Sequence, residues 1–209
     1  MLTRVSVADY TAELASGKPA PGGGSAAGLA GALSAALGEM VANFTVGRQQ
    51  YADGEQEVRA ALERLTELRA ALLALTDSDA QVYPRVRAAY RLPKDTEEQK
   101  MQRSGAIQDA CRAAAEVPGQ IVLRCCETLE QLPVLLEKGN PNLLSDVGVA
   151  AKLALAGAHC AWLNVEINLA VLTDRQFAAQ VRSEMAAKLQ AAEDVTQQLW
   201  EATVKQICK

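Results

Sequence analysis

Apolar positions recur along the chain every three or four residues, the spacing that places them on one face of an α-helix. No stretch alternates apolar and polar residues for long enough to predict a β-strand. The pattern predicts helices over residues 6–15, 25–48, 55–91, 96–115 and 118–138, then a helix that contains Asn164 and reaches Leu172, and a last amphipathic helix from Asp174 to about Cys208.

Capping and breaking residues mark the ends of these helices. Good N-cap residues stand at three of the starts: Ser6, Thr96 and Asp174. Breaks are expected at Gly17 with Pro19, at Asp53-Gly54, at LPKDT and at Gly139-Asn140-Pro141-Asn142. Pro84 should kink the third helix, and Pro118 should begin or bend another. We predict an all-α fold, a single domain over residues 1–209 that forms a bundle of six or seven mostly long antiparallel helices.

Composition and charge narrow the function classes. Apolar residues make up 49% of the chain but aromatic ones only 4%, so the core must consist mainly of Ala, Leu and Val. The net charge is −4 with both signs interspersed, which offers no basic surface to nucleic acid. The first residues carry Asp and Glu and lack the apolar core of a signal peptide, so we expect a cytoplasmic protein.

The longest apolar run, Leu143–Leu172, is expected to be a core helix. It is interrupted by polar residues that the centre of a bilayer would penalise: Asp146, Lys152, His159, Asn164, Glu166 and Asn168. We therefore expect no membrane partner. The five cysteines form no CxxC pair and are odd in number, which indicates reduced and mostly packing thiols.

The stretch KPAPGGGS comes directly before a run of small residues, AAGLAGALSAALG. Three glycines before a helix can aim several backbone N–H groups at one point, where the helix dipole also favours an anion. Behind them Ser25 and Asn43 point in the same direction, with Ala32 and Ala36 on nearly the same line. This stripe predicts a contact surface for a flat ligand or for another helix, and tight helix packing alone would explain it.

Several Asp and Asn side chains lie on the helix faces that the apolar pattern predicts to be buried. At 100° per residue, Asp79 lies within about 40° of the apolar direction of its helix, whereas Asp77 points away. Burial would raise the pKa of Asp79 and suit it to acid or base work, although a capped or salt-bridged structural Asp is equally consistent. Later in the chain, one further face combines Asp146, Gly157, Asn164 and Asn168, which either bond to other helices or bind a polar ligand.

Metal and triad chemistry are poorly supported. His159 is the only histidine, lies off that polar face, and reads as a packing or surface residue. Neither ExxH nor HExxH occurs, so the sequence predicts no metal site. The glycine run also lacks the lysine of a phosphate-binding loop and follows no predicted strand.

Four segments resemble the cyclodeaminase/cyclohydrolase family, which includes the C-terminal domain of formiminotransferase-cyclodeaminase and stand-alone methenyltetrahydrofolate cyclohydrolases. They are PAPGGGSAAGLAGALSAALGEMVANFTVGR, DSDAQVYPRVRAAYRLPKDTEEQKMQR, GNPNLLSDVGVAAKLALAGAHCAWLNVEINL and LTD. The similarity runs from about Val5 to Phe177 with its motifs in the family's order. It implies an all-helical homodimer with a folate site, and no cofactor beyond the tetrahydrofolate substrate.

The resemblance also implies site residues. Asp79, Asp146 and Lys94 would be catalytic: Asp79 or Asp146 as the proton-transfer group, and Lys94 to tune a nearby carboxylate or meet the folate's glutamate tail. Between Asp77 and Asp79, helical periodicity favours Asp79. Substrate-binding positions that the family motifs and the helical stripes suggest are Gly22, Gly23, Gly24, Ser25, Asn43, Asp77, Arg103, Asn140, Asn164 and Asn168. Pro84, inside the helix after Asp79, departs from the family pattern.

Two activities remain open within this resemblance. One hydrolyses 5,10-methenyltetrahydrofolate to 10-formyltetrahydrofolate, and the other closes 5-formiminotetrahydrofolate to the methenyl form with loss of ammonia. We prefer the cyclohydrolase, because these 209 residues include no formiminotransferase domain that would supply the formimino substrate. A helical dimerisation or folate-binding protein without turnover is a more remote alternative.

Overall fold

The computed structural model describes residues 1–208, and the regular structure in that range is entirely helical. The six α-helices are α1 (Val7–Leu14), α2 (Gly23–Asn43), α3 (Glu55–Tyr90), α4 (Glu97–Lys138), α5 (Leu144–Leu169) and α6 (Arg175–Ile207). Three short 3₁₀ helices accompany them: η1 (Leu2–Arg4), η2 (Gln49–Gly54) and η3 (Pro141–Leu143).

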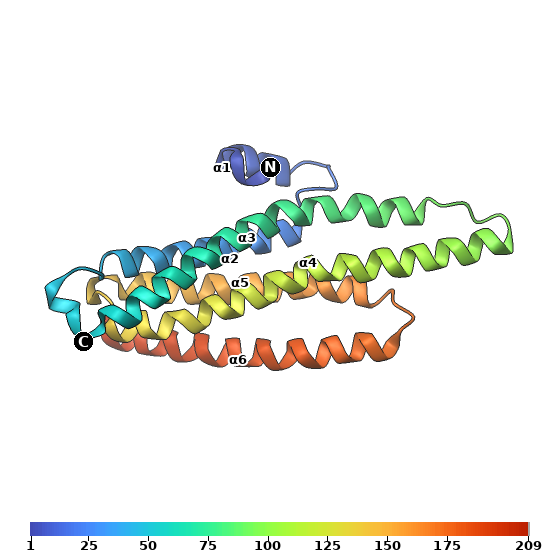
Figure 1. Ribbon diagram of the computed structural model, residues 1–209. Coiled ribbons are helices and arrows are strands. Elements are labelled where there is room, and N and C mark those ends of the chain that lie inside the picture. The colour runs from blue at the N-terminus through green and yellow to red at the C-terminus, as the bar shows by residue number, and fades with distance from the viewer. Residues whose placement is uncertain (209) are drawn as a thin grey trace.

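The five long helices run up and down as one elongated bundle (Figure 1). Helix α4 packs against α2, α3, α5 and α6, and α2 and α5 pack along each other. Helix α1 lies outside the bundle, beyond α3 in the view of Figure 1. The prediction of an all-α bundle of long antiparallel helices is confirmed.

Glycines let α2 approach its neighbours closely. A Cβ atom on Gly31 would lie 2.6 Å from Cys125 Sγ, and one on Gly157 of α5 would lie 3.0 Å from the carbonyl oxygen of Ala27. Ala32 is buried in the same interface. The central part of the small-residue stripe therefore serves helix packing, as the simpler interpretation predicted.

The caps follow the sequence closely. The Ser6 hydroxyl accepts from the N–H of Asp9, and the Asp174 carboxylate accepts from the N–H of Phe177. Thr96 and Gln99 form a reciprocal capping box at the start of α4. Helix α2 ends five residues earlier than expected, at Asn43, and the loop after it turns through Gly47 at φ +76°.

The expected division of the fourth helix near Pro118 is wrong. Residues 97–138 form one helix with Pro118 and Pro133 inside it. A proline in a helix removes one hydrogen bond and costs about 3 kcal/mol. The buried residues on both sides, among them Ala115 and Ile121, pack against neighbouring helices. This tertiary packing keeps the helix continuous.

Two segments, Gly23–Asn43 and Pro141–Leu169, are long and apolar enough to cross a bilayer by length and composition alone. Core helices of globular bundles pass the same test. Here the two helices pack against each other and against α4, and residues such as Ala35, Ala154 and Ala158 are completely buried between helices.

Candidate active site

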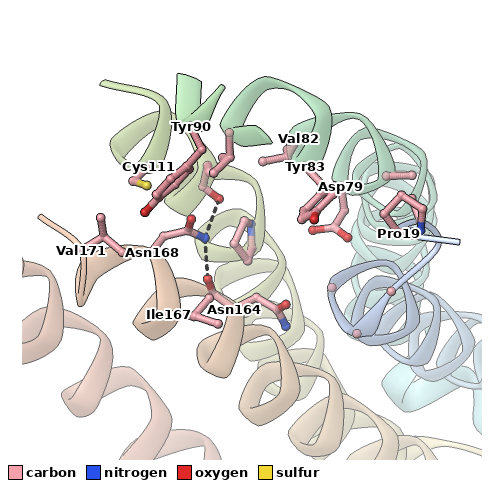
Figure 2. A pocket seen from close by; sticks show the side chains of 18 residues that line it. Pro19, Asp79, Val82, Tyr83, Tyr90, Cys111, Asn164, Ile167, Asn168 and Val171 are labelled. Carbon is pink, nitrogen blue, oxygen red and sulfur yellow. Dashed lines mark hydrogen bonds between the residues drawn. The ribbon is translucent and has the colours of Figure 1, made fainter. Parts of the chain in front are cut away.

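A cavity of about 410 Å³ opens at one end of the bundle, a volume that suits a small-molecule substrate. It lies between the N-terminal end of α2, the last turns of α3, the middle of α4 and the C-terminal half of α5. Its polar groups come from three separate segments (Figure 2): Gly22, Gly23, Gly24, Asp79, Asn164 and Asn168.

The Asp79 carboxylate lies at the N-terminus of α2. No side chain of α2 itself caps this end, and a Cβ atom on Gly24 would come within 2.2 Å of Asp79 Oδ1. The N–H of Ser25 also interacts with the carboxylate. The predicted anion site at the glycine run is therefore occupied by the protein's own carboxylate.

Burial controls the protonation of this group. It raises the pKa of the Asp79 carboxyl above its ordinary value, and the hydrogen bond from the Ser25 N–H offsets the increase only in part. A raised pKa makes a carboxylate a stronger base and its acid form a weaker acid, the direction that favours proton transfer near neutral pH. Asp79 therefore lies in the cavity wall with its pKa raised by burial, as the prediction of an acid-base role requires.

Asn164 and Asn168 lie on the opposite side of the cavity from Asp79 (Figure 2). Each donates an amide hydrogen to a backbone carbonyl one turn earlier, at 2.9 Å to Cys160 and 2.8 Å to Asn164 respectively. The side-chain carbonyl oxygens make no hydrogen bond to residues 1–208. They therefore remain available as acceptors for N–H groups of a ligand.

The other walls of the cavity are apolar and aromatic. Tyr83 and Tyr90 follow Asp79 on α3 at spacings of four and eleven residues, so all three share one helix face. Pro19 and Pro118 add flat surfaces from the loop before α2 and from α4. The sequence did not lead us to predict these four residues as part of the site, although the helical spacing of Tyr83 and Tyr90 from Asp79 was a usable signal.

Arg103 supports this wall from behind. Its guanidinium donates to the carbonyl oxygen of Tyr90, with the shorter N···O distance 3.1 Å, and stands 5.7 Å from the centre of the Tyr90 ring. Arg103 does not line the cavity itself. In this structure Arg103 contacts a lining residue, and its contact with substrate stays a prediction.

Comparisons with known proteins identify the chain's relatives. The sequence profile described as formiminotransferase-cyclodeaminase matches residues 6–187, most of the chain. The chain belongs to the formiminotransferase-cyclodeaminase family. The resemblance found in the sequence motifs is therefore confirmed.

Individual relatives of this family carry two activities in their names. A methenyltetrahydrofolate cyclohydrolase from Methylorubrum extorquens is 40% identical over 92% of both chains. A formimidoyltransferase-cyclodeaminase from Rattus norvegicus is 37% identical over 91% of this chain, which spans only 35% of that longer protein. The crystal structure of a formiminotetrahydrofolate cyclodeaminase from Thermotoga maritima matches with a TM-score of 0.81 and 32% identity, over 99% of this chain and 97% of the other.

The structure brings together only some of the motif positions of this family. The glycines Gly22–Gly24, Asp79, Asn164 and Asn168 line one cavity. Ser25 is completely buried behind it. Asp77 does not line the cavity and accepts hydrogen bonds from the Thr3 amide at 3.1 Å and the Thr3 hydroxyl at 2.6 Å.

The pKa of Asp77 moves opposite to that of Asp79. Burial of the Asp77 carboxyl raises its pKa, but the hydrogen bonds from Thr3, together with the Leu2 N–H and the charged N-terminus, outweigh this effect and bring the pKa below its ordinary value. Asp77 is therefore held as an anion in a structural contact. Asp79 thus faces the cavity and Asp77 does not, as the helical periodicity of α3 predicts.

Three other predicted site residues lie at the other end of the bundle and do not line the cavity: Asn43, Asn140 and Asp146. Asp146 and Asn164 share a helix direction, as predicted, but eighteen residues of helix separate them by about 27 Å along the axis. The expected single polar face of α5 is therefore split. Asn140 caps η3 by accepting from the N–H of Asn142 at 3.0 Å.

Lys94 does not reach the cavity either. It is exposed in the loop between α3 and α4, four residues beyond Tyr90. His159 is a surface residue as expected, 3.1 Å from Glu193. Among the cysteines, Cys111, Cys125 and Cys126 are buried, whereas Cys160 and Cys208 are exposed, so the packing interpretation holds for three of the five.

Proposed function

We propose that this protein is a folate one-carbon enzyme and, more specifically, a methenyltetrahydrofolate cyclohydrolase. The match to the Methylorubrum extorquens cyclohydrolase over 92% of both chains supports this choice. The observation that carries the chemistry is the half-buried Asp79 carboxylate, whose pKa burial raises, in the wall of a substrate-sized cavity.

The cavity complements a reduced folate. The pyrimidine half of the reduced pterin is flat and carries several N–H donors, whereas Asn164 and Asn168 present free carbonyl oxygens. Tyr83 and Tyr90 offer aromatic surface for stacking. With its pterin edge at the asparagines, the substrate places its one-carbon bridge toward Asp79, on the opposite side of the cavity (Figure 2).

In the first step, the Asp79 carboxylate removes a proton from a water molecule while the water oxygen attacks the methenyl carbon. The cationic amidinium becomes a neutral carbinol carbon bonded to N5, N10 and a hydroxyl oxygen. The Ser25 N–H is used on Asp79, but Gly23 and Gly24 at the start of α2 also line the cavity, and their N–H groups can donate to this oxygen.

In the second step, the protonated Asp79 gives its proton to N5 as the bond from N5 to carbon breaks. The hydroxyl group loses its proton to solvent and becomes the carbonyl of 10-formyltetrahydrofolate. One water is consumed and one proton is released overall. The proposed reaction uses no cofactor beyond tetrahydrofolate itself, and a single carboxyl group performs both proton transfers.

The second candidate function is formiminotetrahydrofolate cyclodeaminase, which the structural match to the Thermotoga maritima enzyme favours. N10 would attack the formimino carbon and its proton would pass to the imino nitrogen, and the acid form of Asp79 would then protonate that nitrogen as ammonia departs and the methenyl bridge forms. Both reactions pass through a tetrahedral carbon between two nitrogens, so the same cavity could serve either.

One assay distinguishes these functions. Purified protein is mixed with 5,10-methenyltetrahydrofolate and the absorbance of the methenyl chromophore is followed; a second reaction starts from 5-formiminotetrahydrofolate. Loss of the chromophore faster than without protein supports the cyclohydrolase. Its accumulation with ammonia release, and no accelerated loss, supports the cyclodeaminase. Saturable folate binding without turnover would contradict both.

We also propose that the protein works as a cytoplasmic homodimer. The outward faces of α2 and α5 are apolar and uncovered in the single chain: Leu33 is 50% exposed, Leu163 69% and Ile167 70%. Exposed large apolar side chains on two neighbouring helices are typical of an interface. Because Ile167 also lines the cavity, a second copy on this face would border the site.

A further inference from the structure

The N-terminal segment is attached to the bundle by very few residues. Helix α1 lies outside the bundle (Figure 1), and Tyr10 is its only buried residue, with 6% of its surface exposed. Val7, one turn earlier, is 81% exposed. The contacts of Tyr10 therefore show how α1 is held against the rest of the protein.

Tyr10 begins a chain of hydrogen bonds that ends in the glycine loop. Its hydroxyl oxygen lies 3.3 Å from Ser25 Oγ, and the Ser25 hydroxyl donates to the carbonyl oxygen of Gly22 at 3.0 Å. A serine hydroxyl has one hydrogen, and Ser25 uses it on Gly22. Tyr10 is therefore the donor in its contact with Ser25.

This chain fixes the backbone that forms one wall of the cavity. The carbonyl of Gly22 accepts both the Ser25 hydroxyl and the N–H of Ala26, the latter at 3.1 Å. Glycines have the widest conformational freedom of all residues, so a run of three needs such restraints to keep one geometry. Gly24, two residues along, is the residue that faces the Asp79 carboxylate.

The N-terminal segment, residues 1–10, also restrains the turn of α3 that carries Asp79, the residue in contact with Gly24. Thr3 in η1 binds the carboxylate of Asp77 through its amide and its hydroxyl, and Asp77 precedes Asp79 by two residues on α3. Residues 1–10 thus restrain both the start of α2 and the turn of α3 that carries Asp79.

We infer that Tyr10 is a positioning residue of the active site, which acts through Ser25 to hold the glycine loop against Asp79. This inference rests on the proposed function for its effect on turnover, but not for its effect on the loop. It assigns the N-terminal segment, which contributes little to the core, a role in catalytic geometry.

The test compares Tyr10→Phe with the parent protein and with Tyr51→Phe, which removes a hydroxyl at the opposite end of the bundle. Two quantities are measured: kcat and KM for 5,10-methenyltetrahydrofolate, and hydrogen exchange of the amides in residues 22–27. Loss of one neutral hydrogen bond should lower kcat in Tyr10→Phe by about three- to tenfold. KM should change less, and exchange in residues 22–27 should become faster, while Tyr51→Phe matches the parent.

A second variant protects the test against a folding defect. Ser25→Ala breaks the same chain of hydrogen bonds from the other side. If Tyr10 acts only through Ser25, the double variant should have the same kcat and exchange as Ser25→Ala alone. Unchanged exchange and kcat in Tyr10→Phe would overturn the inference, and so would a lower kcat without faster exchange. If the parent protein turns over neither folate, the proposed function fails, while the exchange comparison still decides whether Tyr10 holds the loop.

Discussion

The Asp79 carboxylate and Gly24 are in direct contact, the carboxylate lying where a larger residue at position 24 would place its side chain. A Cβ atom built on Gly24 would be 2.2 Å from Oδ1 and 2.6 Å from Oδ2 of Asp79. Real Cβ atoms do not approach oxygen so closely, so glycine is required here for packing against the carboxylate rather than for an unusual backbone angle. The contact joins two motifs that are far apart in the sequence.

Replacing Gly24 with Ala should displace the Asp79 side chain and leave the helix intact. A displacement of about 1 Å in a catalytic group commonly costs about a hundredfold in rate. We therefore expect kcat for the folate substrate to fall by about that factor in Gly24→Ala. Gly17→Ala is the matched control, since nothing lies within 4 Å of a Cβ atom there; equal activity of both variants would contradict the proposed role of the contact.

Replacing Asp79 with Asn should stabilise the fold at neutral pH. The pKa of Asp79 is raised in the folded protein by burial, so the folded state holds the proton more tightly than the unfolded state. As pH rises through the interval between the ordinary and the raised pKa, this group's contribution to stability is lost. The variant lacks that loss, and its advantage in urea-unfolding free energy should grow with pH from about 4 and then level off.

Asp77→Asn is a control in which the free energy of unfolding should change in the opposite direction. The pKa of Asp77 is lowered, because the hydrogen bonds from Thr3, with the Leu2 N–H and the charged N-terminus, outweigh its burial. Its stabilising contribution is therefore present above the ordinary pKa and is lost as pH falls through the lowered value. At pH 7, Asp77→Asn should reduce the free energy of unfolding, and an increase would contradict the structural role given to this carboxylate.

Asn168 should affect substrate binding more than the chemical step. Its carbonyl oxygen is a free acceptor in the cavity, and a neutral hydrogen bond to the substrate is worth about 1 kcal/mol. For Asn168→Ala we expect KM to rise roughly five- to tenfold with little change in kcat. Asn142→Ala, outside the cavity, serves as the control; a decrease confined to kcat would argue against substrate recognition by Asn168.

The proposed dimer can be tested on α2. A carboxylate placed on the apolar face of α2 and α5 would be buried without a partner if a second copy covers that face. Leu33→Asp should therefore shift the protein from dimer to monomer in sedimentation velocity. Met101→Asp, at a residue that is 70% exposed on α4, should not; a parent protein that sediments as a monomer would contradict the proposal directly.

The sequence predicts those features that depend on local periodicity. The helix class, the caps at Ser6, Thr96 and Asp174, and the inward direction of Asp79 all follow from the 100° rotation and from capping chemistry. The same rotation predicts which way a side chain points from the helix axis but not its position along that axis. This explains why the single polar face predicted for α5 is wrong. Asp146 and Asn164 point alike and still lie at opposite ends of the bundle.

Features that depend on tertiary packing were beyond local reasoning. The continuity of α4 through Pro118 comes from neighbours on both sides of the proline. The contact of Asp79 with Gly24 depends on how α3 crosses the start of α2, and the bond of Tyr10 to Ser25 depends on where α1 folds back. None of these arrangements produces a repeating pattern of residues from which it could be predicted.

The measurement that tests the central claim most directly is the rate at which Asp79→Asn consumes 5,10-methenyltetrahydrofolate. Removing a proton-transfer group costs at least about a hundredfold. The account predicts a decrease of that size in a protein that is folded and at least as stable as its parent at pH 7. A folded Asp79→Asn protein with the parent's rate would contradict the assignment of Asp79 as the catalytic acid-base.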